Sequence, residues 1–119
     1  MAQLRILLAD SQPKVRFALR VLLENQTGLE IVGEIDDAKD LLAQTEAVSP
    51  DLVLLHWRMN GSVAADVLPE LRAVCPGLYV IVLSARPEAR AAALAAGADA
   101  FVSKVDPPER LLEAISSIK

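Results

Sequence analysis

Polar side chains directly follow four of the short apolar runs in this sequence. They are Asp10 with Ser11, His56, Ser84 and Lys104. His56 is the only histidine, and an imidazole can bind a transition metal, take up a phosphoryl group or hydrogen-bond a carboxylate. Only Asp10 is an obvious second metal ligand, and Lys104 can neutralise it. We therefore expect His56 to be a neutral imidazole that hydrogen-bonds Asp10 or a backbone group, and Lys104 to be the structural partner of Asp10.

The elements that position these residues alternate regularly along the chain. Continuous apolar runs predict strands buried on both faces, as in a parallel sheet between helix layers. Polar breaks with proline or glycine separate these runs from stretches of helical periodicity. The expected strands cover residues 4–9, 29–35, 52–55, 79–83 and 100–103. The expected helices begin at Pro13, at Asp37, after Gly61, after Pro87 in an alanine-rich stretch closed by Gly97, and at Asp106-Pro107-Pro108.

Five rounds of strand then helix predict an α/β fold with a doubly wound, five-stranded parallel sheet and helices on both faces. Right-handed crossovers favour the strand order 2-1-3-4-5, with the least apolar strands at the edges. In that order four strands bring their carboxyl ends to one crevice, where ligands bind in open α/β sheets. The five polar residues named above are therefore expected to lie together.

Composition limits the class of protein. A chain of 119 residues with 53% hydrophobic residues fits one domain over residues 1–119, and any output domain would lie beyond residue 119. The net charge of −4 argues against direct nucleic-acid binding, and Cys75 is the only cysteine. No apolar run approaches the roughly 20 residues that span a bilayer. We expect a cytoplasmic protein that does not contact membranes.

The first predicted helix carries two apolar residues outside its core stripe. Phe17 and Val21 are four residues apart and lie beside that stripe. Partial burial against a neighbouring segment is the expected reason, and a partner surface is the alternative. Together with the alanine-rich helix, these residues also suggest a weak homodimer. The stripe itself is predicted to consist of Val15, Ala18, Leu19 and Leu22.

Several motifs, in order along essentially the whole chain, resemble the receiver domain of two-component response regulators. Residues 6–10 resemble the family's first strand with its acidic end, and residues 50–55 resemble the strand that leads to the phosphoacceptor. Residues 97–104 resemble a stretch with a switch aromatic, here Phe101, and a lysine, here Lys104. Ser84 matches the switch hydroxyl. Residues 28–34 further resemble the branch whose members carry a C-terminal helix-turn-helix and regulate transcription.

The resemblance implies a flavodoxin-like fold and a role in phosphorelay signalling, without enzymatic activity of its own. It also implies protein partners, namely a sensor kinase or an output domain. In the resemblance, Ser84 is the switch hydroxyl and Phe101 is the switch aromatic. A simpler interpretation is that Ser84 is a loop or helix-capping hydroxyl and that Phe101 is an aromatic residue packed on an edge strand.

The sequence departs from the receiver pattern at the site itself. The family has an aspartate, which accepts the phosphoryl group, where this chain has His56. Its acidic pair is reduced to Asp10 and Ser11, the proline expected after Met59 is Asn60, and the segment from Ser84 to Gly97 is shorter. The family's site, with three carboxylates and one lysine, would have a net charge of about −2, which attracts Mg²⁺. In this chain Asp10 and Lys104 leave the site with a net charge of about zero. We therefore expect Mg²⁺ to bind weakly or not at all.

These departures predict a pseudo-receiver: an atypical, phosphorylation-independent module for regulation through protein–protein interaction. One alternative is a phosphorelay receiver with an unconventional acceptor. Another is a regulatory domain that binds a small ligand in a crevice around His56 and Trp57. Trp57, Arg58 and Asn60 form the loop beside this pocket, and Trp57 is expected either to cap the crevice or to anchor a partner.

Overall fold

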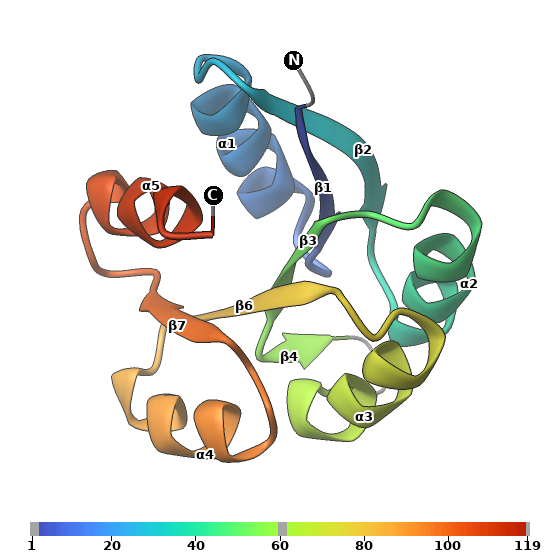
Figure 1. Cartoon of the computed structure of the whole chain (residues 1–119). Helices are drawn as coiled ribbons and strands as arrows, with labels where there is room; N and C mark the ends of the chain where they lie inside the picture. Colours follow the sequence, from blue (N-terminus) through green and yellow to red (C-terminus); the bar gives the residue numbers. More distant parts are fainter. Residues whose placement is uncertain (1–2, 60–61, 119) are drawn as a thin grey trace.

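The computed structural model describes residues 3–59 and 62–118, which form a parallel sheet covered by helices on both faces (Figure 1). The strand order β2-β1-β3-β6-β7 confirms the predicted order, because β4 and β5 form a separate short hairpin. The strands of the sheet are β1 (Leu4–Ala9), β2 (Leu29–Ile35), β3 (Leu52–His56), β6 (Tyr79–Ser84) and β7 (Ala100–Ser103).

Helices α1 and α5 cover one face of the sheet, and α2, α3 and α4 cover the other (Figure 1). A single 3₁₀ turn, η1, precedes α4. The bounds are α1 (Pro13–Glu24), α2 (Ala38–Val48), α3 (Ala64–Val74), η1 (Pro87–Ala89), α4 (Arg90–Ala95) and α5 (Pro108–Ser116). None of the helices within the described residues is long and apolar enough to cross a bilayer.

The central strands are apolar without interruption because each of their faces is buried. In β3, Leu52 and Leu54 pack with α1 and α5, whereas Val53 and Leu55 pack with α2, α3 and α4. All four side chains are almost completely inaccessible to solvent. Edge strand β2 has Glu30 and Glu34 exposed, as its interrupted sequence predicts.

Local signals in the sequence account for several helix ends. Pro13 occupies the first turn of α1, where its missing N–H costs nothing. Asp37 caps α2, since its Oδ1 accepts a hydrogen bond from the Asp40 backbone N–H at 2.9 Å. Gly97 follows α4 with φ of 109°, the positive φ that its predicted capping role requires.

Two details differ from the sequence prediction. The core residue of α1 is Leu23, which is fully buried, whereas Ala18 of the predicted stripe is exposed. The chain also forms the hairpin of β4 (Arg58–Met59) and β5 (Ser62–Val63), which was not predicted because two-residue strands carry no readable periodicity. Asn60 lies outside the described residues.

Candidate functional site

The parallel register brings the ends of four strands level with one another. Ala9 of β1 pairs with Leu55 of β3, and His56 pairs with Leu83 of β6. Ser84 in turn pairs with Ser103 of β7, so Lys104 follows at the same edge. The predicted clustering of polar residues at this edge is thus present.

Asp10 is the centre of the cluster. Its side chain is 2% exposed, and Oδ2 lies 2.6 Å from Lys104 Nζ, so the predicted pairing is present. Oδ1 accepts a hydrogen bond from the Gln12 backbone N–H at 2.9 Å. The guanidinium of Arg16 donates to the backbone carbonyl of Asp10 at 2.6 Å, which ties α1 to the site. Both oxygens of the buried carboxylate are therefore already engaged by donors of the chain.

His56 lies next to this ion pair but does not join it. Its Nδ1 is 3.7 Å from Asp10 Oδ2, which is too far for a hydrogen bond, so the predicted bond to Asp10 is not formed. Lys104 occupies that oxygen instead. Nδ1 is buried and has no hydrogen-bond partner among the described residues.

The surroundings of His56 favour its neutral form. Burial lowers the pKa of the imidazole below its usual 6.5, and the positive charge of Lys104 lowers it further. Asp10 and the backbone of Leu83 act in the opposite direction but do not outweigh these two effects. The expectation of a neutral imidazole agrees with this balance.

The remaining predicted site residues lie around the cluster in different environments. Ser11 is half-buried next to Asp10, and Arg58 is exposed. Trp57 is half-buried and packs against the apolar cluster on the α2–α3 side of the sheet. Its backbone N–H donates to the Leu83 carbonyl at 2.8 Å. Trp57 is therefore in large part a packing residue.

Ser84 and Phe101 occupy positions that match the simpler of their two interpretations. Ser84 Oγ accepts a hydrogen bond from the Arg86 backbone N–H at 3.0 Å and so organises the loop after β6. Phe101 is only 8% exposed on edge strand β7 and belongs to the core cluster beneath α4. The Ser84 hydroxyl therefore accepts a loop hydrogen bond, and the Phe101 ring packs in the core.

The resemblance implies Mg²⁺ at this edge of the sheet, but the side chains present do not suit it. Mg²⁺ prefers several oxygen ligands in octahedral geometry. Asp10 is the one carboxylate of the predicted site set, and Lys104 already neutralises it. His56 presents an imidazole, which suits transition metals better. The donor set of these residues therefore does not fit Mg²⁺.

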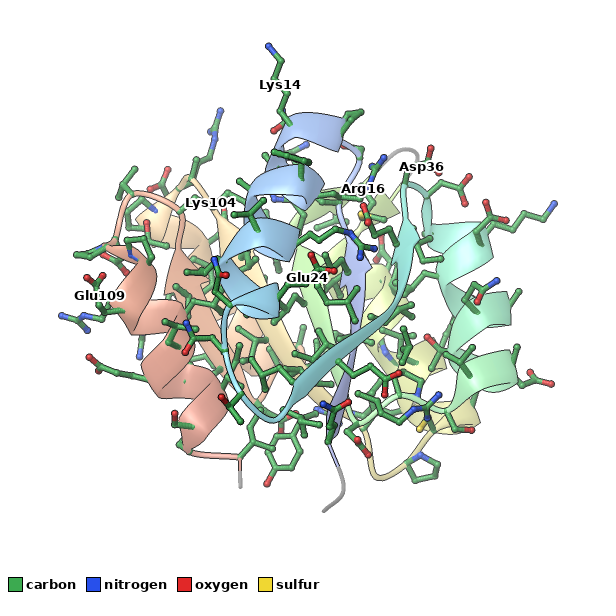
Figure 2. All side chains as sticks on the ribbon, turned by 90° about the horizontal axis from the view of Figure 1, so that it is seen from above. Lys14, Arg16, Glu24, Asp36, Lys104 and Glu109 are labelled. Carbon is green, nitrogen blue, oxygen red and sulfur yellow. The ribbon has the colours of Figure 1, made fainter. Side chains whose placement is uncertain are left out.

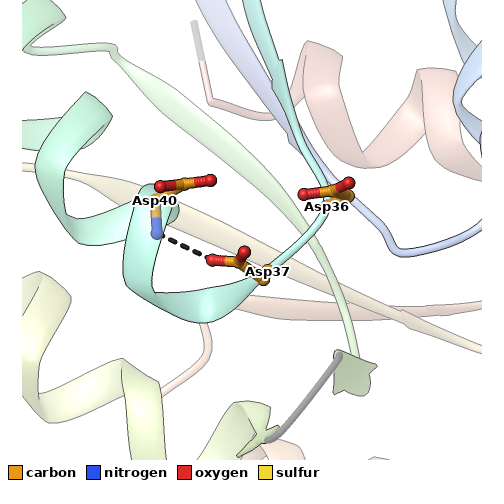
Figure 3. A group of neighbouring side chains, drawn as sticks. All are labelled: Asp36, Asp37 and Asp40. Atoms are coloured by element: carbon orange, nitrogen blue, oxygen red, sulfur yellow. Dashed lines mark hydrogen bonds between the residues drawn. The ribbon is translucent and has the colours of Figure 1, made fainter.

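A group of three carboxylates lies near the same edge, beyond β2. The side chains of Asp36, Asp37 and Asp40 offer oxygen atoms within 4.8 Å of one another (Figure 3). Asp37 is the N-cap of α2, and carboxylates at a helix N-terminus are stabilised by its dipole. The start of α2 thus explains why acidic residues gather there.

A groove that the sequence did not predict runs between α1 and α5. It has a volume of about 410 Å³, and most of the side chains around it are aliphatic. Lys104 is one of the lining residues, so the groove adjoins the polar cluster. The helical periodicity of α1 and α5 identified two apolar faces, but not the space left between them. The other lining residues are Lys14, Val15, Ala18, Leu19, Leu22, Leu83, Val102, Ser103, Asp106, Pro107, Pro108 and Leu111.

Comparison with known proteins identifies the family. Residues 6–116 match the model of the response regulator receiver domain. The chain is 32% identical over 113 residues to the nitrate/nitrite response regulator NarP of Escherichia coli, covering 93% of this chain and 53% of NarP. It is 34% identical over 117 residues to the putative virulence transcription regulator BvgA of Bordetella pertussis, covering 97% of this chain and 54% of BvgA. The chain thus spans about half the length of these relatives.

Solved structures agree with this assignment. The receiver domain of the putative response regulator NarL from Mycobacterium tuberculosis superposes with a TM-score of 0.89 at 28% identity, covering 99% of this chain and 97% of that domain. A LuxR-family response regulator from Aurantimonas gives a TM-score of 0.90 at 26% identity, covering 98% and 85% respectively. The chain therefore belongs to the response regulator receiver domain family.

Proposed function

We propose that this receiver domain works in two-component signalling as a protein-interaction module whose conformation does not depend on phosphorylation. The observation that supports this most is the closed ion pair between Asp10 and Lys104. His56 ends β3, at the position where the family resemblance places the acceptor aspartate. A carboxylate that carries a lysine at 2.6 Å has little capacity left for a dication.

The electrostatics of phosphoryl transfer point the same way. The reaction needs a nucleophile together with cations placed to stabilise charge on the transferred group. Here the cation Lys104 is neutralised by Asp10, and His56 carries no carboxylate. The interior positions of Ser84 and Phe101 further suggest that the domain holds one conformation. On this proposal the domain has no enzymatic activity.

The alternatives are weaker on particular observations. Phosphorylation of His56 would need a cation free to stabilise the transferred group, but Lys104 is paired with Asp10, and Nδ1 of the imidazole is buried. A small-ligand site around His56 and Trp57 would need an open apolar crevice there, whereas the half-buried Trp57 packs against the core. Neither alternative gains support from the geometry of the described residues.

We infer a cytoplasmic setting and protein partners for this module. Its relatives are named as response regulators and a transcription regulator, and the chain spans about half of each. The proposed partners are therefore a DNA-binding output domain and a sensor kinase. The receiver itself, with net charge −4, is not expected to bind nucleic acid.

Titration with Mg²⁺, followed by fluorescence of Trp57, tests the proposal. Trp57 is the only tryptophan and directly follows His56, so it reports on this edge of the sheet. The wild-type chain should show no saturable change, whereas a Ser11→Asp/His56→Asp variant should. Asp40→Asn in both backgrounds removes any signal from the acidic group at α2. A saturable wild-type response that Asp10→Asn abolishes would contradict the proposal.

A further inference from the structure

The α1–α5 groove is an apolar space that the fold leaves open on one face of the sheet. Its volume of about 410 Å³ lies within the roughly 300–1,000 Å³ of pockets that hold small molecules. Helix α1 contributes half-buried aliphatic side chains, namely Val15, Leu19 and Leu22. The sheet and α5 contribute Leu83, Val102 and Leu111. A ligand in the groove would therefore meet mainly hydrocarbon.

The groove reaches down to the core of the domain. Leu83, Leu111 and Val102 line the open space, yet they are only 3%, 4% and 8% exposed. A flat apolar patch would leave such residues far more accessible. The space is thus recessed, and a slender chain or a small ring enters it more readily than the broad surface of a folded partner does.

One charge among the lining residues has no counter-ion within the domain. Lys104 is paired with Asp10 at 2.6 Å, and Asp106 lies just before α5, where the helix dipole stabilises a carboxylate. Lys14, by contrast, forms no ion pair with any of the residues that the structure describes. Its side chain lines the groove and extends from the first turn of α1 beyond the body of the molecule (Figure 2). The ammonium is therefore free to turn toward an anion at the mouth of the groove.

We propose that the α1–α5 groove binds an amphiphilic carboxylate, with a medium-length acyl chain in the apolar space and the carboxylate paired with Lys14. A neutral apolar compound would fill the same space but leave Lys14 unpaired, and a cationic one would be repelled by it. The ligand that this chemistry selects is a free monoanion with a hydrocarbon body. Burial of the chain supplies most of the affinity, because an exposed ion pair contributes little.

The groove adjoins the polar cluster, so a ligand there would contact the strands that carry the cluster. Leu83 immediately precedes Ser84, and Ser103 immediately precedes Lys104. A chain in the groove would touch the last residues of β6 and β7 and the stem of Lys104. In a receiver without a phosphorylation switch, the ligand would provide the input. This regulatory role rests on the proposed function, whereas binding does not, since a ligand titration tests the groove and phosphorylation tests the polar cluster.

Isothermal titration calorimetry with octanoate, decanoate and dodecanoate, each below the concentration at which it forms micelles, tests the site. Each should bind one-to-one, and the affinity should rise about fourfold for each added methylene until the chain exceeds the groove. Dodecyltrimethylammonium, which has the same chain and the opposite charge, should bind less tightly than dodecanoate. With dodecanoate, the amide NMR signals of Leu83, Val102 and Lys104 should shift, whereas that of Leu94 on α4, across the sheet, should not.

Two variants with matched controls locate the ligand. Ala18→Trp places a large side chain at the rim of the groove and should weaken dodecanoate binding about tenfold or more, because it displaces at least two methylene groups. Phe17→Trp is its control, since Phe17 is 68% exposed on the same helix and is not among the lining residues. Lys14→Gln should weaken binding about two- to fivefold, as for an exposed ion pair. Its control is Lys39→Gln on α2. All four positions are exposed, so the variants should melt like wild type.

Several results would overturn the proposal. One is a wild-type chain that binds no dodecanoate, or that binds dodecyltrimethylammonium equally well. Another is binding that Ala18→Trp leaves intact, or that Phe17→Trp weakens as much. If a second copy of the chain already fills the groove, sedimentation velocity should show a dimer that takes up no dodecanoate, and this result would also exclude the ligand site.

Discussion

Removing either partner of the Asp10–Lys104 ion pair should destabilise the fold, and the two losses should be unequal. In Lys104→Met the carboxylate of Asp10, whose side chain is 2% exposed, stays buried with only the Gln12 N–H as donor. Breaking a buried pair on one side costs about 3–5 kcal/mol in the free energy of unfolding. In Asp10→Asn the ammonium of Lys104, whose side chain is 19% exposed, can turn toward water.

The expected cost of Asp10→Asn is therefore lower. The amide oxygen of asparagine can still accept the bond from Gln12, so the variant loses mainly one charge-assisted contact, about 1.5–3 kcal/mol. Urea denaturation followed by circular dichroism measures both values. If the slope of the unfolding free energy against urea concentration is the same as in wild type, the unfolded states are comparable.

The sign of the Asp10→Asn effect is the informative result. In a crevice with excess negative charge, removing one carboxylate relieves repulsion and stabilises the fold. In this chain Asp10 faces one lysine and a neutral imidazole, so the same substitution should destabilise it. A more stable Asp10→Asn variant would refute the reasoning, because it would show that the site carries uncompensated negative charge.

Two further predictions concern His56 and Gly33. Since the pKa of His56 is lowered from 6.5, the folded chain binds fewer protons than the unfolded chain just below pH 6.5. The contribution of His56 to the free energy of unfolding is therefore present above that pH and is lost as the pH falls toward the folded-state pKa. The His56→Gln variant lacks this group, so its free energy of unfolding should fall less than that of wild type between about pH 7.5 and about pH 5.5. An equal loss in urea denaturation would contradict this. A Cβ at Gly33 would lie 2.8 Å from Leu7 Cδ1, so Gly33→Ala should cost about 1–3 kcal/mol, whereas Gly77→Ala, which meets nothing within 4 Å, should be nearly neutral. Equal melting temperatures of these two glycine variants would count against the close packing of β2 on β1.

The sequence was sufficient to predict the main elements of the fold. The apolar runs at β3 and β6 are buried on both faces, and a parallel sheet between helix layers is the arrangement that buries both. Strand order then followed from crossover rules, and with it the gathering of Asp10, His56 and Lys104 at one edge. These predictions rest on periodicity and chirality, which act along the whole chain.

Other features depend on side-chain placement that no periodicity encodes. His56 was expected to hydrogen-bond either Asp10 or a backbone group. The bond to Asp10 is not formed, because Lys104 reaches the same oxygen and leaves Nδ1 at 3.7 Å, whereas the backbone of Leu83 does interact with the imidazole. Phe17 was expected to be partly covered, yet its side chain is 68% exposed among the residues that the structure describes. Tertiary packing alone decides where Lys104 reaches and whether a segment in the described part of the chain covers Phe17.

The most direct test of the proposed function is mass spectrometry after incubation with acetyl phosphate and Mg²⁺. On this proposal the wild-type chain should gain no phosphoryl group, because His56 stands where the family resemblance places the acceptor aspartate and Lys104 holds Asp10. The Ser11→Asp/His56→Asp variant, which adds a nucleophile and the second acidic residue, should become phosphorylated, and His56→Asp alone only in part. If the double variant is not phosphorylated, the geometry of the loops, and not the missing carboxylates, prevents phosphorylation. A wild-type chain that becomes phosphorylated would contradict the account.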